Sequence, residues 1–195
     1  MSPRGLLFIT LFNSILGLSV LFPILAPLGR WLGFSEIEVG LLSTSYALMQ
    51  FVMSPLWGRR RERGGRKPVL VVGIIGFALS FLAFAIIAQL GKQGLFDRWT
   101  TFGLLLASRV AGGVFSSATL PTAQAYIADT TDRADRTAGM ALIGAAFGLG
   151  VVIGPAIGAA LSTLSLLAPV YFSAGFALLN AVFVWIKLPE PVKHV

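Results

Sequence analysis

The chain alternates between long apolar segments and short polar ones. A helix that spans the hydrocarbon core of a bilayer needs about 20 mostly apolar residues. Six segments reach or approach that length, namely 6–28, 37–57, 69–90, 100–127, 138–161 and 166–186. Because the connections are short, consecutive helices should be antiparallel neighbours. The pattern predicts an all-α membrane protein with a six-transmembrane-helix bundle in residues 1–187. Residues 188–195 would form a cytoplasmic tail or the start of a linker.

Several predicted helix ends carry their own signals. Ser35 and Glu38 have the S-x-x-E spacing of a capping box, which satisfies free N–H groups at the start of the second helix. Pro68 fits the first turn of the third helix, where its missing N–H has no cost. The fourth segment is long, and we expect its inner end to leave the bilayer near Ala128. The first segment is too long for the apolar part of a signal peptide, so we interpret it as a retained helix.

The composition agrees with lipid as the solvent. Hydrophobic residues make up 56% of the chain and charged residues 12%, whereas soluble domains average about 45–50% and about 25%. A soluble fold of this length has too little interior to bury so much apolar surface. Cysteine is absent and the single histidine, His194, lies in the tail, so no metal site or cofactor is predicted. The sequence has no nucleophile–base pair or phosphate-binding loop, and we do not expect an enzyme.

The 15 basic residues indicate orientation and not nucleic-acid binding, because nearly all of them flank the apolar segments. Eleven lie on one predicted side: Arg4, Arg59, Arg60, Arg61, Arg63, Arg66, Lys67, Arg133, Arg136, Lys187 and Lys193. The opposite side holds Arg30, Lys92 and Arg98. By the positive-inside rule both termini are cytoplasmic, and the basic segments should contact anionic lipid headgroups. We therefore expect an integral protein of a bacterial cytoplasmic membrane.

A basic segment between the second and third predicted helices has a distinctive spacing. Residues 58–67 fit G-x-x-x-[DE]-R-x-G-R-[RK], and the matching positions are Gly58, Glu62, Arg63, Gly65, Arg66 and Lys67. This spacing resembles the signature loop of the major facilitator superfamily, in which the loop acts as a gate that latches two helix bundles on the cytoplasmic side. The family usually has aspartate at Glu62, and small or apolar residues at Arg60 and Arg61. An anchor that contacts lipid headgroups is the alternative interpretation.

Two further motifs lie in the helices where the same family has them. Residues 109–113 resemble its intramembrane R-x-x-x-G element, and residues 150–158 resemble the G-x-x-x-G-P-x-x-G element of its drug:proton antiporter branch. Tyr126 to Asp129, with the Asp/Arg cluster that follows, resembles the helix 4–5 junction of tetracycline- and multidrug-efflux relatives. The resemblance covers nearly the whole chain. It implies half of a major facilitator fold, built as a 3+3 inverted repeat, and a place for Asp129 in the gate.

Arg109 is the one charged residue within an apolar span. A cation at that depth carries an insertion penalty of about 2.5–3.5 kcal/mol, so it normally faces a cavity or a partner. Neutral candidates for that partner are Asn13 and Ser14 in the first helix and Gln50 in the second. The resemblance implies a role for Arg109 in proton transfer or in the packing of helices one and four. Snorkelling to the outer interface is the alternative.

A row of glycines marks one face of the fifth predicted helix. Gly150, Gly154 and Gly158 recur every four residues, and Pro155 bends the helix axis. Small residues at this spacing let helices approach closely, so ordinary packing is one explanation for them. The resemblance implies in addition that this face lies where two bundles meet, and that it is associated with antiport.

Polar residues within the spans suggest a pathway lining. The candidates are Asn13, Ser14, Tyr46, Gln50 and Gln124. Isolated polar residues also bond neighbouring helices, which is the alternative for each of them. No carboxylate lies deep inside a span, although proton-coupled antiporters that the chain resembles often have one. Glu38 is the nearest candidate, and its capping box explains it more simply.

The chain has half the number of helices expected of a complete member of the family it resembles. Members of the family have about twelve helices in two similar halves, and substrate binds between the halves near the midplane. The sequence therefore predicts the N-terminal half of a secondary active transporter, as a fragment, a truncated product or one part of a split protein. It would export a small amphipathic compound or drug in exchange for protons by alternating access. Its partners would be membrane lipid, the substrate, protons and a second six-helix half. The alternatives are a symporter or facilitator for a sugar or organic acid, and a six-helix scaffold that transports nothing.

Overall fold

The computed structural model describes residues 3–130 and 136–190, with only the backbone described at residues 3–4, 61–64 and 136. All the secondary structure in these ranges is helical. The helices are α1 (Pro3–Leu32), α2 (Glu36–Gly64), α3 (Arg66–Lys92), α4 (Arg98–Ser116), α5 (Thr119–Thr130), α6 (Arg136–Ser162) and α7 (Ala168–Lys187). Within the described chain, six stretches are long and apolar enough to cross a membrane, and α4 and α5 together form the fourth. The predicted all-α architecture with six spans is confirmed.

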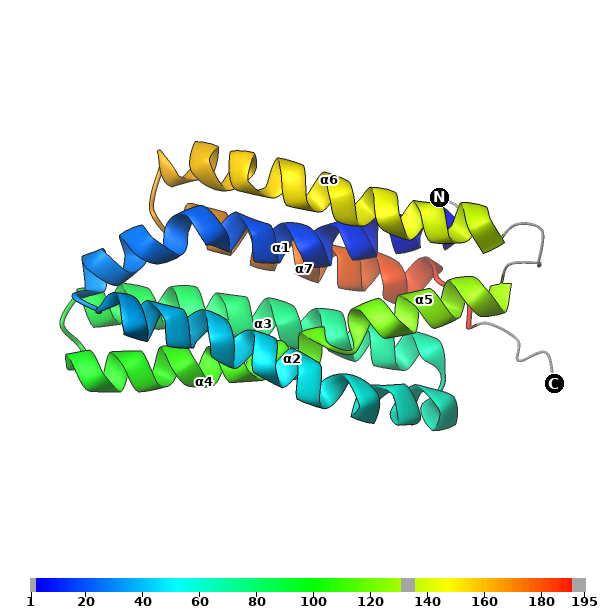
Figure 1. Ribbon diagram of the computed structural model, residues 1–195, viewed down its shortest axis with the longest axis horizontal. Helices are drawn as coiled ribbons and strands as arrows, with labels where there is room; N and C mark the ends of the chain where they lie inside the picture. The colour runs from blue at the N-terminus through cyan, green and yellow to red at the C-terminus, as the bar shows by residue number, and fades with distance from the viewer. Residues whose placement is uncertain (1–2, 131–135, 191–195) are drawn as a thin grey trace.

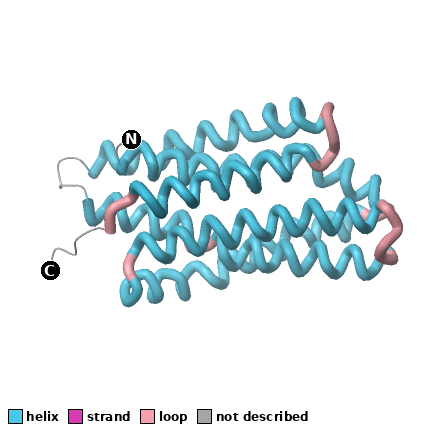
Figure 2. Tube along the Cα trace, turned by 180° about the vertical axis from the view of Figure 1, so that it is seen from behind, coloured by secondary structure: helices cyan, strands magenta, loops and turns pink. Residues whose placement is uncertain are grey.

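The helices run alongside one another in an elongated bundle, and the loops gather at its two ends (Figure 1 and Figure 2). α1 begins and α7 ends at the same end of the bundle, where α2 also passes into α3 (Figure 1). α1 packs against α6 and α7, while α4 packs against α2 and α3. If α1, α2 and α3 are matched in order with α4–α5, α6 and α7, each of these contacts has its counterpart. The contacts are therefore those of two three-helix repeats, as the predicted fold class requires.

The segment between the second and third spans is more helical than predicted. α2 continues through Gly64, beyond the predicted end at residue 57, and α3 begins at Arg66. Arginine and glutamate have high helix propensity, so residues 59–63 extend the helix beyond the apolar region. Gly65 makes the turn, with φ of 90° and ψ of 163°, a conformation open almost only to glycine. The signature segment is thus a helix end, one turn residue and a helix start.

The fourth span is broken, whereas the sequence pattern predicts one helix over residues 100–127. α4 ends at Ser116 and α5 begins at Thr119. The N–H of Ser117 bonds the Gly113 carbonyl at 3.2 Å, but the N–H of Ala118 bonds the Phe115 carbonyl at 3.1 Å, which is a tighter turn. Residues 116–119 at the break are two serines, an alanine and a threonine, and Pro121 follows, so the prediction of one continuous helix was wrong where the sequence becomes polar.

The end of α1 and the starts of α2 and α4 are tied together by one carboxylate. The predicted capping box is present: the N–H of Ser35 donates to Glu38 Oε2 at 2.7 Å, and the N–H of Glu38 donates to Ser35 Oγ at 3.4 Å. Arg98 forms an ion pair of 2.6 Å with the same carboxylate and donates to the Gly33 carbonyl at 2.9 Å. Glu38 is therefore engaged at the end of the bundle where α1 ends. At the opposite end, Pro68 lies in the first turn of α3, as predicted.

Candidate functional site

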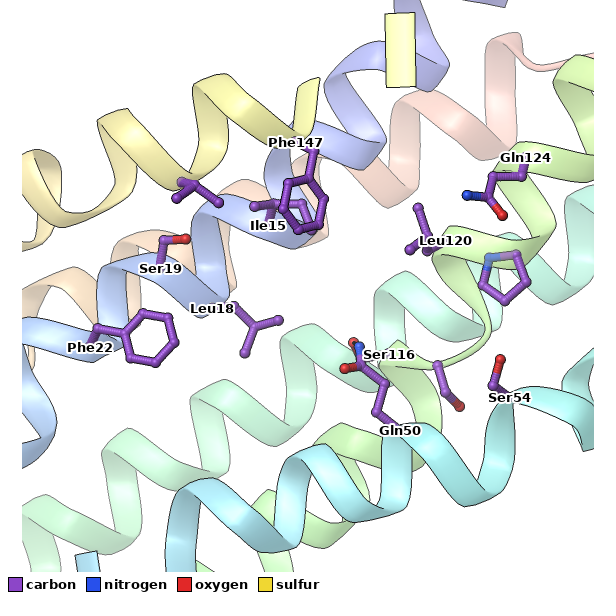
Figure 3. Close-up of a pocket in the computed structure, with 13 residues that line it drawn as sticks. Ile15, Leu18, Ser19, Phe22, Gln50, Ser54, Ser116, Leu120, Gln124 and Phe147 are labelled. Atoms are coloured by element: carbon purple, nitrogen blue, oxygen red, sulfur yellow. Dashed lines mark hydrogen bonds between the residues drawn. The ribbon is translucent and has the colours of Figure 1, made fainter. Parts of the chain in front are cut away.

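A cavity of about 460 Å³ opens between α1, α2, the α4–α5 break and α6 (Figure 3). Its wall consists of Ile15, Leu18, Ser19, Phe22, Gln50, Ser54, Ser116, Ser117, Leu120, Pro121, Gln124, Phe147 and Val151. The lining is mainly apolar, with amide and hydroxyl groups at a few points. This size and make-up are typical of small-molecule sites, which occupy about 300–1,000 Å³.

Helix geometry brings the wall of α1 together with a polar patch on the opposite side. Ile15, Leu18 and Phe22 are spaced three and four residues apart, so they share one face of α1. Across the cavity, the Gln50 side chain donates to Ser116 Oγ at 3.2 Å, and the two residues approach each other from α2 and α4 in Figure 3. The hydroxyl of Tyr46 donates to the same oxygen at 2.5 Å. Ser116, the last residue of α4, is the centre of this patch.

The polar residues predicted to line a pathway separate into two groups. Gln50 and Gln124 lie on the wall of this cavity, and Tyr46 lies on the wall of the adjoining one. Asn13 and Ser14 line neither. Ser14 donates to the Thr10 carbonyl at 2.9 Å, and Asn13 is buried. Sequence reasoning missed Ser116, because one serine among several in apolar helices carries no distinguishing signal.

An adjoining cavity of about 290 Å³ contains Arg109 in its wall. Arg109 is 4% exposed, and its Nε donates to the Leu42 carbonyl at 3.2 Å. Its Cζ lies 4.3 Å from the ring centroid of Tyr46, 5.8 Å from that of Phe81 and 5.9 Å from that of Phe84. Such cation–π contacts stabilise a desolvated cation by about 2 kcal/mol or more. Arg109 therefore sits against a cage of three rings and one carbonyl.

The partners predicted for Arg109 were wrong. Ser14 donates to the Thr10 carbonyl and Gln50 donates to Ser116 Oγ, while Asn13 Oδ1 is buried with no hydrogen-bond partner among the described residues. Gln50 does share a cavity wall with Arg109. The arginine interacts with the backbone of α2 and with aromatic side chains of α2 and α3, because these are the groups that surround it in the middle of the bundle.

Several predicted gate residues meet at the end of the bundle where α1 begins and α7 ends. Both Nε and Nη2 of Arg66, at the start of α3, lie 2.6 Å from Asp129 Oδ2, near the end of α5. Glu190, which follows α7, accepts from the N–H of Arg66 at 2.5 Å and from the N–H of Lys67 at 3.1 Å. The hydroxyl of Tyr126 donates to the Pro189 carbonyl at 2.7 Å. These contacts tie the ends of α3, α5 and α7 to one another.

Not every predicted gate residue belongs to this cluster. Gly58 lies inside α2, with nothing within 4 Å of where a Cβ would stand. Glu62 and Arg63 are part of α2, but their side chains lie outside the described residues. Glu190 was missed, since its role depends on the end of α7 meeting the start of α3, which is 124 residues away along the chain.

The glycine face of α6 packs against α1. A Cβ on Gly150 would lie 2.9 Å from Ile15 Cβ, one on Gly154 would lie 2.5 Å from Ser19 Cβ, and one on Gly158 would lie 2.7 Å from the Val20 carbonyl oxygen. Pro155 lies within α6 beside this face. The face is thus filled by α1 of the same bundle, whereas the resemblance led us to expect it where two bundles meet.

The fold and the cavities define a polytopic helical membrane protein with a solute-sized cavity between its helices. Residues 7–195 match the Major Facilitator Superfamily, and the chain belongs to this family. It is 32% identical over 189 residues to Multidrug resistance protein 1 of Bacillus subtilis strain 168, covering 97% of this chain and 46% of that protein. It is 27% identical to Quinolone resistance protein NorA of Staphylococcus aureus strain MRSA252, covering 96% of this chain and 45% of that protein. The chain thus spans about half the length of these relatives.

Solved transporter structures also match this chain over about half of their length or less. The crystal structure of the human organic anion transporter MFSD10 (TETRAN) superimposes with a TM-score of 0.76 at 27% identity, over 97% of this chain and 48% of that one. The proton:xylose symporter XylE superimposes with a TM-score of 0.72 at 16% identity, over 97% of this chain and 40% of that one. At that identity the likeness to XylE concerns the fold alone. The predicted family membership and the half-transporter architecture are confirmed.

Proposed function

We propose that this bundle is one half of an efflux transporter that exports small amphipathic compounds in exchange for protons. The observation that carries the proposal is the mainly apolar cavity, in a chain 32% identical to a protein named for multidrug resistance. Apolar walls with few hydrogen-bonding groups accept varied molecules, because hydrophobic contact is not directional. Phe22 and Phe147 would contact the apolar body of the substrate, and Gln50 and Gln124 would meet its polar groups.

A second six-helix bundle would complete the site. In the apolar 18-residue stretch of each span, only 11% is buried in α2 and 22% in α6. The corresponding share is 44–56% in the other four spans. Both helices also contribute to the cavity wall. A partner bundle on this side would close the cavity around the substrate, and alternating access would follow from rocking of the two bundles. We assign both termini to the cytoplasm on the positive-inside rule.

The cluster of Arg66, Asp129 and Glu190 would then form this bundle's share of the cytoplasmic gate. It lies at the end of the bundle where the positive-inside rule places the cytoplasm, and it holds three helix ends in one arrangement. Proton coupling would depend on a carboxylate of the second bundle. In the described part of this chain, the two cavity walls contain no carboxylate.

Accumulation of a neutral dye tests the function. The chain should be co-expressed with the separately encoded C-terminal half of Multidrug resistance protein 1, in cells that lack their own dye exporters. Cells with both halves should retain less Nile red than cells with either half alone, and a protonophore should abolish the difference. Leu18→Trp would fill the cavity and stop efflux, whereas Leu79→Trp on the exposed face of α3 provides the matched control.

The possible results separate the parts of the proposal. Unchanged dye retention in cells from which the two halves co-purify would overturn the efflux function. Efflux that persists in the presence of the protonophore would overturn proton coupling alone. Equal efflux by the two tryptophan variants would exclude the cavity as the substrate site.

A further inference from the structure

We infer that the substrate of this cavity is an amphipathic organic anion, with its acidic group directed toward Arg109 and its apolar body against Phe22. The inference rests on the proposed function and adds the substrate class to it. Its first basis is the wall that the two cavities have in common. The cavity that contains Arg109 and the larger one share Leu18, Phe22 and Gln50 in their walls. A molecule in the larger cavity is therefore separated from the arginine by no more than a shared wall.

Among the described residues, no carboxylate neutralises the charge of Arg109. Its contacts are one carbonyl and three aromatic rings, which stabilise a cation but bring no negative charge. The described carboxylates near the spans are engaged at the helix ends: Glu38 with Arg98, and Asp129 with Arg66. Because charges interact strongly where little water screens them, the cavity has a net positive wall.

The rest of the lining fits an anion of moderate size. The Gln50 and Gln124 amides and the Ser54 hydroxyl can donate hydrogen bonds to an acidic group or to other acceptors. Aromatic rings could in principle attract a cation instead. The face of Tyr46 is already covered by the arginine, however, and Phe22 lines both cavities beside that positive charge. A cationic ligand would thus meet repulsion without a compensating carboxylate.

Three probes that share a naphthalene ring and carry an anionic, a neutral or a cationic group test this selectivity. They are 2-naphthoate, 2-naphthylmethanol and (2-naphthylmethyl)trimethylammonium. Their binding to the purified chain in phosphatidylcholine nanodiscs is measured by equilibrium dialysis. At about 0.15 M salt, exposed charges are screened beyond about 8 Å, so the basic inner end contributes little. We expect the anion to bind about tenfold more tightly than the cation, with the alcohol between them.

Variants assign the selectivity to Arg109. Arg109→Gln should bring anion and cation to within about twofold of each other, whereas Arg109→Lys should keep the preference because it keeps the charge. Arg60→Gln removes the same formal charge from an exposed site on α2 and should leave the preference unchanged. If Arg109→Gln fails to fold, the order of the three probes on the unaltered chain still decides the inference.

Two results would overturn the inference. One is a cation that binds at least as tightly as the anion, and the other is an absence of binding by all three probes. A preference that survives in folded Arg109→Gln protein would likewise remove Arg109 from its assigned role. The Nile red experiment uses a neutral dye, so its failure would overturn efflux without touching anion selectivity. Conversely, efflux of Nile red with no anion preference would support the proposed efflux function and overturn the inferred substrate class.

Discussion

The contact between Gly65 and Glu190, at the end of the bundle where α7 ends, is sensitive to a single substitution. A Cβ on Gly65 would lie 2.7 Å from Glu190 Oε1, and the backbone there has φ of 90°. Gly65→Ala should therefore lower the free energy of unfolding by about 1–3 kcal/mol. Gly58→Ala is the matched control, because that glycine lies inside α2 with open space around it. Alanine should be neutral there, or stabilising by up to about 1 kcal/mol.

Denaturant unfolding in detergent, followed by circular dichroism, measures both effects. Glu190→Ala should itself destabilise the protein by about 1 kcal/mol, since it removes the acceptor for two N–H groups at the start of α3. In that background Gly65→Ala should be less harmful, because only the strain of the backbone remains. Equal effects of the Gly58 and Gly65 substitutions would contradict the close contact.

The sequence alone identified single residues with unusual chemistry for a membrane span, but it did not identify the residues that contact them. Arg109 stood out because it is a cation within an apolar span. Its partners could not be identified in the same way, because every residue has a carbonyl and the chain has 15 phenylalanines among which two had to be chosen. Gln50 and Gln124 could be predicted as lining residues from their polarity. Ser116 could not, because its importance comes from the helix break beside it.

At the scale of helices, close contact between α1 and α6 depends on the glycine row. Gly154→Ala would place a methyl group 2.5 Å from Ser19 Cβ, so the two helices must separate. We expect a loss of about 1–3 kcal/mol in the free energy of unfolding, as for other overpacked interfaces. Gly148→Ala lies in the same helix with nothing within 4 Å of the added Cβ. It should be neutral or slightly stabilising, because alanine is the better helix former.

Thermal unfolding of the two variants, in one detergent and at one protein concentration, gives the comparison. Gly144→Ala provides a second control on the open side of α6. Should Gly154→Ala melt together with the two controls, the glycine row would not be needed for α1–α6 packing, and another explanation for the motif would be required.

Hydropathy could predict the number of spans, because a helix in lipid must be apolar over about 20 residues whatever its neighbours. It could not predict where the helices end. Residues 59–63 remain helical outside the apolar region, and the turn at Ser117 and Ala118 interrupts a span whose average over about 20 residues is still apolar. Helix ends depend on local hydrogen bonds and not on the solvent that surrounds the helix.

At the scale of the whole molecule, the six spans are unequally buried. α2 and α6 are the most exposed, although the sequence does not distinguish them by hydropathy from the buried spans. Apolar residues face lipid, a partner bundle or the interior equally well, so composition alone cannot assign their neighbours. The 3+3 contacts place α2 and α6 in equivalent positions of the two repeats, which argues that their exposure has one cause.

Coverage of α2 and α6 by a second bundle would explain their exposure. The chain contains no cysteine, so single cysteines can be introduced to test this. Phe51→Cys on α2 and Val152→Cys on α6 replace side chains that are 80% and 73% exposed. If a second bundle covers these helices, a lipid-soluble maleimide should react with both cysteines severalfold more slowly when the C-terminal half of Multidrug resistance protein 1 is co-expressed. Leu79→Cys on α3 is the control, because this side chain is 53% exposed on a helix that contributes nothing to the cavity wall, and we expect it to stay in lipid. Equal reaction rates with and without the partner at all three positions would mean that lipid covers α2 and α6, and the cavity would then lack its second wall.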